Sequence, residues 1–186
     1  MVNLRRITSA EDKDFKKLAE LYIEAFPPEE RRDISQLERL LKSQSEMFYN
    51  AVECDGKLAG LFSFWNFGDF WYLEHLAVYA DMRNHKIGQQ ILDFAKEHLT
   101  GIRLLEVEPD DHEMAVRRIN YYQRNGYKIL EKDYVQPSYD GMRSALPLWI
   151  MGNEEYDDPA LLQKHIEIIK EKVYYGPQGA KAGNEK

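Results

Sequence analysis

The spacing of apolar residues divides the chain into strands and helices in a fixed order. Strict alternation marks strands, and apolar residues three or four positions apart mark one-sided helices. Asp55-Gly56 is a strong signal for a two-residue hairpin between two strands. The predicted strands are 4–7, 47–53, 57–67, 70–79, 102–107, 127–134 and 146–151. The predicted helices are 11–26, a second one carrying the apolar residues of 34–41, then 86–99, 113–125 and 159–174.

This order predicts an α/β protein with a mixed sheet flanked by helices and an extra C-terminal helix. Ser9 is expected to cap the first helix, and Asn125-Gly126 is expected to end the fourth one with glycine in a left-handed conformation. No internal repeat and no linker separates parts of the chain. We therefore expect a single domain over residues 1–175, followed by a frayed tail over 176–186.

Composition excludes several classes of function. A chain of 186 residues with 44% apolar residues is long enough to bury a core, and its net charge of −7 argues against broad nucleic-acid binding. Cys54 is the only cysteine, so an internal disulfide and a thiolate zinc cluster are excluded, and no metal is expected. The longest apolar run, 58–65, is too short to cross a bilayer, and the first residues lack an apolar signal core. We expect a cytoplasmic protein without a membrane partner.

The segment 73–92 carries the most specific chemistry. An apolar strand enters a short loop with cationic and amide side chains that ends at Gly88, where an amphipathic helix takes over. The N-terminus of a helix gathers backbone N–H groups and positive potential, and here Arg83 and Lys86 lie beside it. This arrangement favours a phosphate group, which indicates a phosphorylated cofactor.

Two segments resemble the GNAT superfamily of acyl-CoA-dependent N-acyltransferases. The family loop has the form Gln/Arg-x-x-Gly-x-Gly/Ala, and here residues 83–88 read Arg-Asn-His-Lys-Ile-Gly, with Lys86 at the first glycine position. Residues 121–127, Tyr-Tyr-Gln-Arg-Asn-Gly-Tyr, are similar to the Phe/Leu-Tyr-x-x-x-Gly-Phe/Tyr segment. Ala115 replaces an asparagine that many members carry. The resemblance covers residues 70–151.

The resemblance implies the GNAT fold and acetyl-CoA (coenzyme A) as co-substrate. It implies an amine acceptor that attacks directly in a ternary complex. Tyr122 stands at the family's tyrosine position and is the expected acid for the departing thiolate, because a phenol can donate while neutral at pH 7. The expected cofactor-binding residues are Leu76, Ala77, Val78, Arg83, Asn84, His85, Lys86, Ile87, Gly88 and Gln89.

Two glutamates compete for the role of base. Glu106 lies in the apolar strand 102–107, at the acidic position of related N-terminal amine acetyltransferases, and a carboxylate is costly to bury there without a purpose. Glu74 lies beside the expected carbonyl position and is also a common acidic position in the family. Strand alternation places His75 on the face opposite Glu74, so we expect His75 to pack rather than catalyse.

The predicted function is N-acetyltransfer to a primary amine of a small molecule or, second, of a peptide. The alternative is a non-catalytic acyl-CoA-binding or regulatory domain, because Lys86 and Ala115 depart from the family pattern. Acids at Glu29, Glu30 and Asp140 could attract a cationic amine, although self-pairing at the surface is the simpler interpretation. The C-terminal helix could mediate a homodimer or pack on the sheet.

Overall fold

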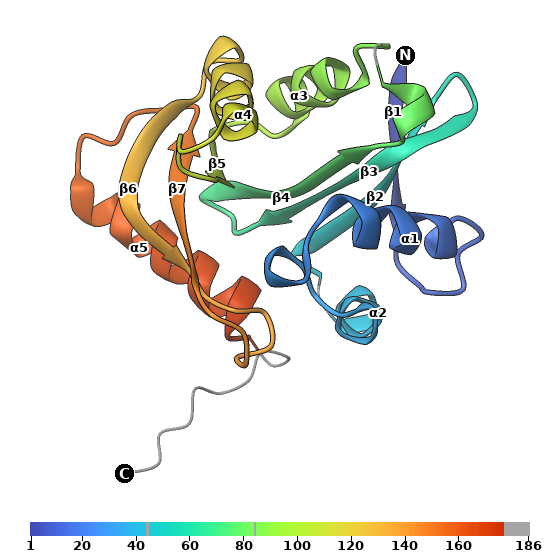
Figure 1. Ribbon diagram of the computed structural model, residues 1–186, viewed down its shortest axis with the longest axis horizontal. Helices are drawn as coiled ribbons and strands as arrows, with labels where there is room; N and C mark the ends of the chain where they lie inside the picture. The colour runs from blue at the N-terminus through green and yellow to red at the C-terminus, as the bar shows by residue number, and fades with distance from the viewer. Residues whose placement is uncertain (44, 84, 177–186) are drawn as a thin grey trace. The chain divides into compact units, whose positions relative to one another are not determined.

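The computed structural model describes residues 1–43, 45–83 and 85–176. Its elements follow the predicted order (Figure 1). The strands are β1 (Val2–Ile7), β2 (Met47–Cys54), β3 (Lys57–Asn66), β4 (Phe70–Val78), β5 (Ile102–Val107), β6 (Lys128–Gln136) and β7 (Leu146–Gly152). The helices are α1 (Phe15–Ala25), α2 (Ile34–Ser43), α3 (Ile87–His98), α4 (Glu113–Arg124) and α5 (Pro159–Ile169).

The chain divides into two compact units, Met1–Gly101 and Ile102–Lys186. Each is described by itself, and the single domain over residues 1–175 stays a prediction. Most of the predicted tail, residues 177–186, lies outside the described residues.

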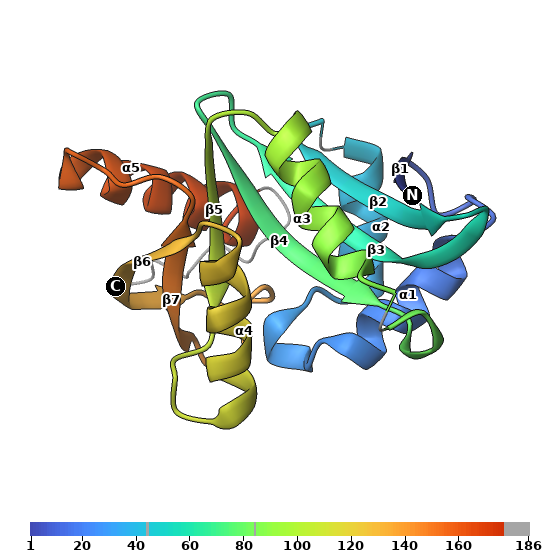
Figure 2. The same cartoon turned by 90° about the horizontal axis from the view of Figure 1, so that it is seen from above.

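The first unit contains four antiparallel strands in the order β1-β2-β3-β4. Helices α1 and α2 cover one face of this sheet and α3 covers the other, as Figures 1 and 2 show. Asp55 and Gly56 both have positive φ angles, 51° and 76°, which is the geometry of a type I′ hairpin turn. The prediction of a hairpin at this pair is therefore confirmed.

Helix α1 is shorter at both ends than the predicted span 11–26. The hydroxyl of Ser9 accepts a hydrogen bond from the N–H of Glu11 at 3.1 Å, so Ser9 closes a turn rather than the helix. At the other end Phe26 is extended, because it precedes Pro27 and the proline ring disfavours a helical conformation in the residue before it. The prediction was wrong by four residues at the start, because local turn bonds compete with the helix.

Strand β4 contains an extra residue opposite β3. Ser63 pairs with His75 and Phe64 pairs with Leu73, which leaves Glu74 as the bulged residue. A bulge interrupts strict alternation of side chains. The prediction that His75 lies on the opposite face from Glu74 was therefore wrong: Nδ1 of His75 lies 3.7 Å from Oε2 of Glu74.

The second unit contains three antiparallel strands in the order β5-β7-β6. Helix α4 lies on one face of this sheet and α5 on the other (Figures 1 and 2). Helix α5 ends at Ile169, and the chain continues as a π-helical segment, Lys170–Tyr174. The predicted helix 159–174 thus has the right extent, but its last turn is wider than an α-helix.

Among the described residues, no helix is both long enough and apolar enough to span a membrane. The same part of the chain contains no cluster of three or more His, Cys, Asp or Glu side chains placed to hold a metal ion.

Candidate active site

Residues 83–88, called here the phosphate turn, connect a 3-10 turn to α3. The 3-10 turn is Ala80–Met82, and Arg83 follows it in an extended conformation. Arg83, His85 and Lys86 are exposed, whereas Ile87, the first residue of α3, is buried. Asn84 lies outside the described residues.

Lys86 occupies the family's glycine position in a glycine-like conformation. Its φ and ψ angles are 55° and 25°, in the left-handed region, and it precedes the first helical residue of α3. This conformation costs an L-residue roughly 1–2 kcal/mol. Lys86 therefore keeps the left-handed backbone conformation that a glycine would adopt, and its side chain contributes a positive charge.

The first turn of α3 is suited to a diphosphate. Its first residues are Ile87, Gly88 and Gln89, and the N–H groups of a first turn have no partner within the helix. The side chain of Lys86 does not cap them. With two exposed cations in the phosphate turn, these groups fit the charge and the hydrogen-bonding needs of the coenzyme A diphosphate.

Two amide side chains near this turn have structural roles. Nε2 of Gln89 donates to Oδ1 of Asp93 at 2.9 Å, along the surface of the helix. Oε1 of Gln90 accepts the backbone N–H of Val2 at 3.1 Å, which ties the start of α3 to β1. Gln90 was absent from the prediction, because a side chain that reaches a residue 88 positions away leaves no local pattern.

Strand β4 presents backbone groups away from β3. The N–H of Tyr79 donates to the carbonyl of Ala59 at 3.0 Å, so alternation directs the N–H groups of Leu76 and Val78 to the opposite edge. Gly60 is required beside this strand, since a Cβ there would lie 2.1 Å from the carbonyl oxygen of Ala77. Leu76 and Val78 can therefore offer donors on the edge that does not face β3.

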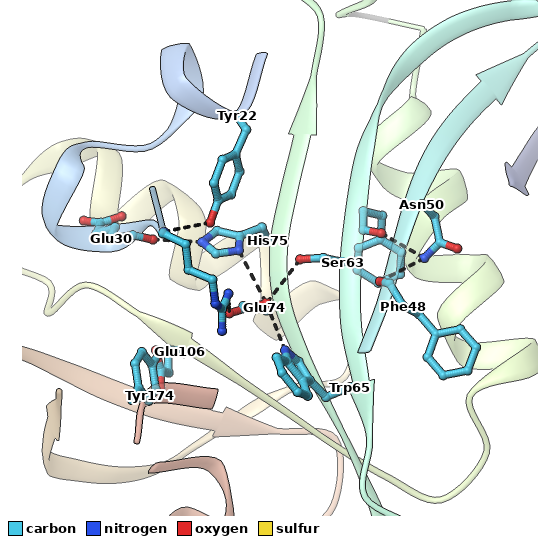
Figure 3. Close-up of polar contacts among 12 residues, drawn as sticks. Tyr22, Glu30, Phe48, Asn50, Ser63, Trp65, Glu74, His75, Glu106 and Tyr174 are labelled. Atoms are coloured by element: carbon cyan, nitrogen blue, oxygen red, sulfur yellow. Dashed lines mark hydrogen bonds and ion pairs between the residues drawn. The ribbon is translucent and has the colours of Figure 1, made fainter. Parts of the chain in front are cut away.

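Glu74 is the centre of a buried polar network, drawn in Figure 3. Its side chain has no exposed surface, and Nη1 of Arg32 donates to Oε1 at 2.5 Å. Nε1 of Trp65 donates to Oε2 at 2.9 Å, and the hydroxyl of Ser63 reaches the same oxygen at 3.5 Å. Both oxygens of the carboxylate therefore accept hydrogen bonds from residues of the same unit.

The charge balance around Glu74 favours its ionised form. Burial alone would raise its pKa, but the Arg32 guanidinium, the neighbouring His75 and the Trp65 N–H outweigh burial and hold the pKa of Glu74 well below its usual range. A carboxylate held in this way is a poor proton acceptor. The same geometry fixes Arg32, which is only 3% exposed.

His75 anchors the segment between α1 and α2. Its Nε2 lies 2.8 Å from the backbone oxygen of Glu30, and its ring meets those of Tyr22 and Phe26 edge-on at 4.9 Å and 4.5 Å. The hydroxyl of Tyr22 accepts the N–H of Arg32 at 3.1 Å. The packing role expected for His75 agrees with these contacts.

Glu106, the other candidate base, has different surroundings. It lies on β5, is partly exposed and accepts a hydrogen bond from each of two tyrosines. The hydroxyl of Tyr134 donates to Oε1 at 2.5 Å, and that of Tyr174 donates to Oε2 at 2.8 Å. Two neutral phenols therefore orient this carboxylate.

Tyr122 is held at the C-terminal end of α4 by a Schellman motif. The N–H of Tyr127 donates to the carbonyl of Tyr122 at 3.1 Å, and the N–H of Gly126 donates to that of Gln123 at 3.0 Å. Gly126 has a φ angle of 86°, as the predicted glycine cap requires. The rings of Tyr122 and Tyr127 pack edge-on at 5.8 Å, the apolar contact that accompanies this motif.

The phenol of Tyr122 is protonated at neutral pH. Burial raises the pKa of Tyr122 to about 12, and the positive charge of Arg118 opposes this effect only in part. Ala115, at the position of the family's asparagine, is buried in the first turn of α4, where its N–H donates to Nδ1 of His112 at 3.2 Å. The helix therefore starts with a histidine cap that the sequence did not suggest.

The remaining polar candidate in this unit is bound within its own turn. Asp140 accepts hydrogen bonds from the Ser138 hydroxyl and from the N–H groups of Met142 and Arg143, and it forms an ion pair with Arg143 at 2.6 Å. Burial raises the pKa of Asp140, but these donors outweigh it and lower the value to about 2. The self-paired interpretation fits this residue.

Sequence reasoning did not identify Arg32, Tyr134 and Tyr174 as partners of the two glutamates. Arg32 stands in a charged stretch that is typical of a solvated helix start, yet it is buried. The two tyrosines lie far along the chain from Glu106, so no spacing rule connects them. The signal that was present is the carboxylate itself, because a glutamate inside an apolar strand calls for polar partners.

The fold and the two sequence motifs are those of the GNAT class. The chain belongs to the Acetyltransferase (GNAT) family, whose model matches residues 15–127, more than half of its length. It is similar to the provisionally named acetyltransferase YjbC of Bacillus subtilis (strain 168), with 31% identity over 116 residues. That match covers 61% of this chain and 56% of YjbC, so it spans just over half of that relative.

Solved structures agree with this assignment. A provisionally named GNAT-family acetyltransferase from Bacteroides thetaiotaomicron matches with 33% identity and a TM-score of 0.86, over 96% of this chain and 99% of its own. The PaiA N-acetyltransferase from Thermoplasma acidophilum, solved with coenzyme A, matches with 20% identity and a TM-score of 0.56, over 83% of this chain and 99% of its own. At that identity, the second likeness shows the fold alone.

Proposed function

We propose that this protein transfers an acetyl group from acetyl-CoA to a primary amine of a small molecule, by direct attack in a ternary complex. Membership of the GNAT family supports acyl transfer, and several structures of the same fold were solved with coenzyme A. A peptide amine is the second candidate for the acceptor. The net charge of −7 suits a cationic acceptor in either case.

The observation that carries the proposal is the state of Tyr122. The Schellman motif fixes its backbone, and its phenol, whose pKa burial raises above the ordinary value to about 12, is neutral at pH 7. A neutral, fixed O–H is what protonation of a departing thiolate requires. Tyr122 is therefore assigned as the general acid.

Glu106 is the better candidate for the base. Glu74 is fully buried and bound to Arg32, whose positive charge stabilises the carboxylate and makes it a weak proton acceptor. Glu106 is partly exposed and accepts hydrogen bonds from two phenols, which are neutral donors and add no positive charge of their own. We assign Glu106 as the base, directly or through a water molecule, and Glu74 as the residue that positions Arg32.

Acetyl-CoA supplies the acetyl group as a thioester. The N–H groups at the start of α3, with Arg83 and Lys86, would hold its diphosphate. The outward N–H groups of Leu76 and Val78 would bind the pantetheine amides and the negative charge that develops on the carbonyl oxygen. His85 and Gln89 would contribute their backbone to the same binding surface.

The proton transfers balance as follows. The ammonium form of the acceptor gives a proton to Glu106, and its nitrogen then forms a bond to the acetyl carbon. The bond from that carbon to sulfur breaks, and Tyr122 gives its proton to the thiolate. The nitrogen is positively charged after the attack and loses a second proton to water, which gives the neutral amide. Glu106 also releases its proton to water and Tyr122 regains one from it, so one proton is released overall. The products are an acetylated amine and coenzyme A with a free thiol.

The alternative is an acyl-CoA-binding domain without turnover. It rests on the two departures from the family pattern, Lys86 and Ala115. Lys86 keeps the left-handed backbone that a glycine would supply. Ala115 sits in a capped first turn, where its N–H already has an acceptor. Neither substitution disrupts the local backbone, so neither gives a structural reason to prefer the binding domain.

A panel of amines separates these functions. Free thiol release would be measured with acetyl-CoA and, in turn, polyamines, amino sugars, amino acids and short peptides with a free N-terminus. An enzyme acting on small amines releases thiol with members of the first three groups, and the acetylated amine appears by mass spectrometry. Release with peptides alone would reassign the acceptor. Thermal stabilisation by acetyl-CoA without release from any amine would establish the binding domain instead.

A further inference from the structure

The Glu106 carboxylate is held by two buried phenols, one on each oxygen. Tyr134 donates to Oε1 at 2.5 Å and Tyr174 donates to Oε2 at 2.8 Å; their residues are only 3% and 1% exposed. Figure 3 shows Tyr174 beside Glu106. Hydrogen bonds to an ionised carboxylate are among the stronger kind, and one on each oxygen restrains the orientation of the group.

Strand β6 brings Tyr134 to this position through an extra residue. Glu131 pairs with Ile150 and Tyr134 pairs with Leu148, so three steps along β6 match two steps along β7. In a regular strand Asp133 would stand opposite Leu148 and would direct a second carboxylate to the face of Glu106. The bulge places a phenol there instead. Glu106 pairs with Ile150 on the same strand β7.

The π-helical segment Lys170–Tyr174 has a similar effect on Tyr174. One extra residue in a helical turn rotates the following side chains by about 100°, so the wider turn decides which face Tyr174 occupies. The N–H of Tyr175 closes the turn on the carbonyl of Lys170 at 2.9 Å. The ring of Tyr139 packs against that of Tyr174 at 4.7 Å. Tyr174 is thus fixed by both backbone and ring contacts.

We propose that Tyr134 and Tyr174 are positioning residues that hold the Glu106 carboxylate in the orientation the acceptor amine needs. Both lie beyond residues 15–127, which the family model matches, so the C-terminal part of this chain completes the site. Phenols orient the carboxylate without cancelling its charge, whereas Arg32 cancels that of Glu74. This inference rests on the proposed function for its catalytic meaning.

The first test removes single hydroxyl groups and follows catalysis. Tyr174→Phe and Tyr134→Phe should each lower kcat/KM for the acceptor on the order of tenfold, since each loses a hydrogen bond to a charged group. The acidic limb of the pH–rate profile should move to higher pH, because the ionised form of Glu106 loses a donor. KM for acetyl-CoA should not change.

Tyr156→Phe is the matched control. Tyr156 lies in the same unit, and its hydroxyl is 2.7 Å from Nδ1 of His165 rather than from Glu106. This variant should lower the melting temperature about as much as Tyr174→Phe does and should leave the rate and the pH profile unchanged. Equal effects of the two variants on stability, with no effect of Tyr174→Phe on the rate or its pH dependence, would overturn the inference.

A titration without turnover separates this inference from the proposed function. The carboxyl carbon of Glu106 would be followed by NMR in protein labelled at glutamate, with Glu106→Gln identifying its signal. Tyr174→Phe should raise the titration midpoint by about one pH unit, and Tyr156→Phe should leave it in place. An unchanged midpoint in Tyr174→Phe refutes the inference even in an active enzyme. A shifted midpoint in a protein that releases no thiol supports the positioning contact and refutes only the proposed function.

Discussion

Replacing Gly126 by alanine tests how Tyr122 is held. Gly126 has a φ angle of 86°, and a Cβ added there would meet no atom within 4 Å, so the substitution introduces no clash. The cost is conformational: a left-handed backbone is unfavourable for an L-residue by roughly 1–2 kcal/mol. Part of it is offset because alanine lowers the entropy of the unfolded chain. We expect Gly126→Ala to lower the free energy of unfolding by about 1 kcal/mol.

The same substitution should slow catalysis more than its stability cost suggests. The N–H groups of Gly126 and Tyr127 close the end of α4 on Gln123 and Tyr122, and relaxing this turn displaces Tyr122. A displacement of about 1 Å can cost on the order of a hundredfold in rate, so a loss of at least about tenfold in kcat is expected. Gly126→Asn should be milder in both measurements, because asparagine tolerates the left-handed region better than alanine does.

Gly68→Ala is the matched control for this experiment. Gly68 has a φ angle of 85°, also has no atom within 4 Å of an added Cβ, and lies in the turn between β3 and β4. Urea denaturation would give the stability of each variant, and thiol release would give kcat. Equal losses of stability with unequal losses of kcat support the reasoning. A Gly126→Ala variant as active as Gly68→Ala would refute the claim that this turn positions Tyr122.

Three further results are expected. Lys86→Gly should raise the free energy of unfolding by up to about 1 kcal/mol, because glycine adopts a φ angle of 55° without the cost that lysine carries. The same variant should raise KM for acetyl-CoA, because a cation is lost. Urea denaturation measures the first effect and steady-state kinetics the second. Arg32→Met should cost about 3–5 kcal/mol at pH 7, since it leaves Glu74 buried without its cation. Because the pKa of Glu74 is lowered, this pair stabilises the wild-type protein above the pKa of ~4.3 that the carboxyl has in the unfolded chain, and the stabilisation is lost as the pH falls through the folded pKa. Arg32→Met should instead gain stability on acidification. Urea denaturation midpoints measured as a function of pH test both expectations. Because the pKa of Tyr122 is raised to about 12, deprotonation of this phenol should produce no alkaline loss of kcat below about pH 10, and a rate profile at saturating acceptor checks this.

Local patterns were sufficient for the order of the elements. Alternation, the Asp55-Gly56 pair and the glycine at position 126 each act through short-range sterics, and the structure has them where they were expected. The bulge at Glu74 was not predictable, because an extra residue in one strand is defined only by its partner strand. That bulge is also why the simple alternation argument for His75 failed.

The candidate site was predictable only where a motif is contiguous. The phosphate turn and the segment ending at Tyr127 each lie within seven residues, so their chemistry can be read along the chain. The partners of the two glutamates cannot be read along the chain in this way, because Arg32 is 42 positions from Glu74 and Tyr174 is 68 positions from Glu106. Sequence therefore left two carboxylates competing for the role of base, and the tertiary contacts distinguish the salt-bridged Glu74 from the phenol-bound Glu106.

The most direct test of the central claim replaces Tyr122 by phenylalanine in the protein with its best acceptor amine. Binding of coenzyme A, by calorimetry, should stay within about twofold of wild type, because the phenol hydroxyl is not assigned to the diphosphate contacts. The kcat for thiol release should fall on the order of a hundredfold or more, since the departing thiolate loses its acid. A Tyr122→Phe variant that binds coenzyme A and turns over at the wild-type rate would contradict the assignment of Tyr122 as the general acid.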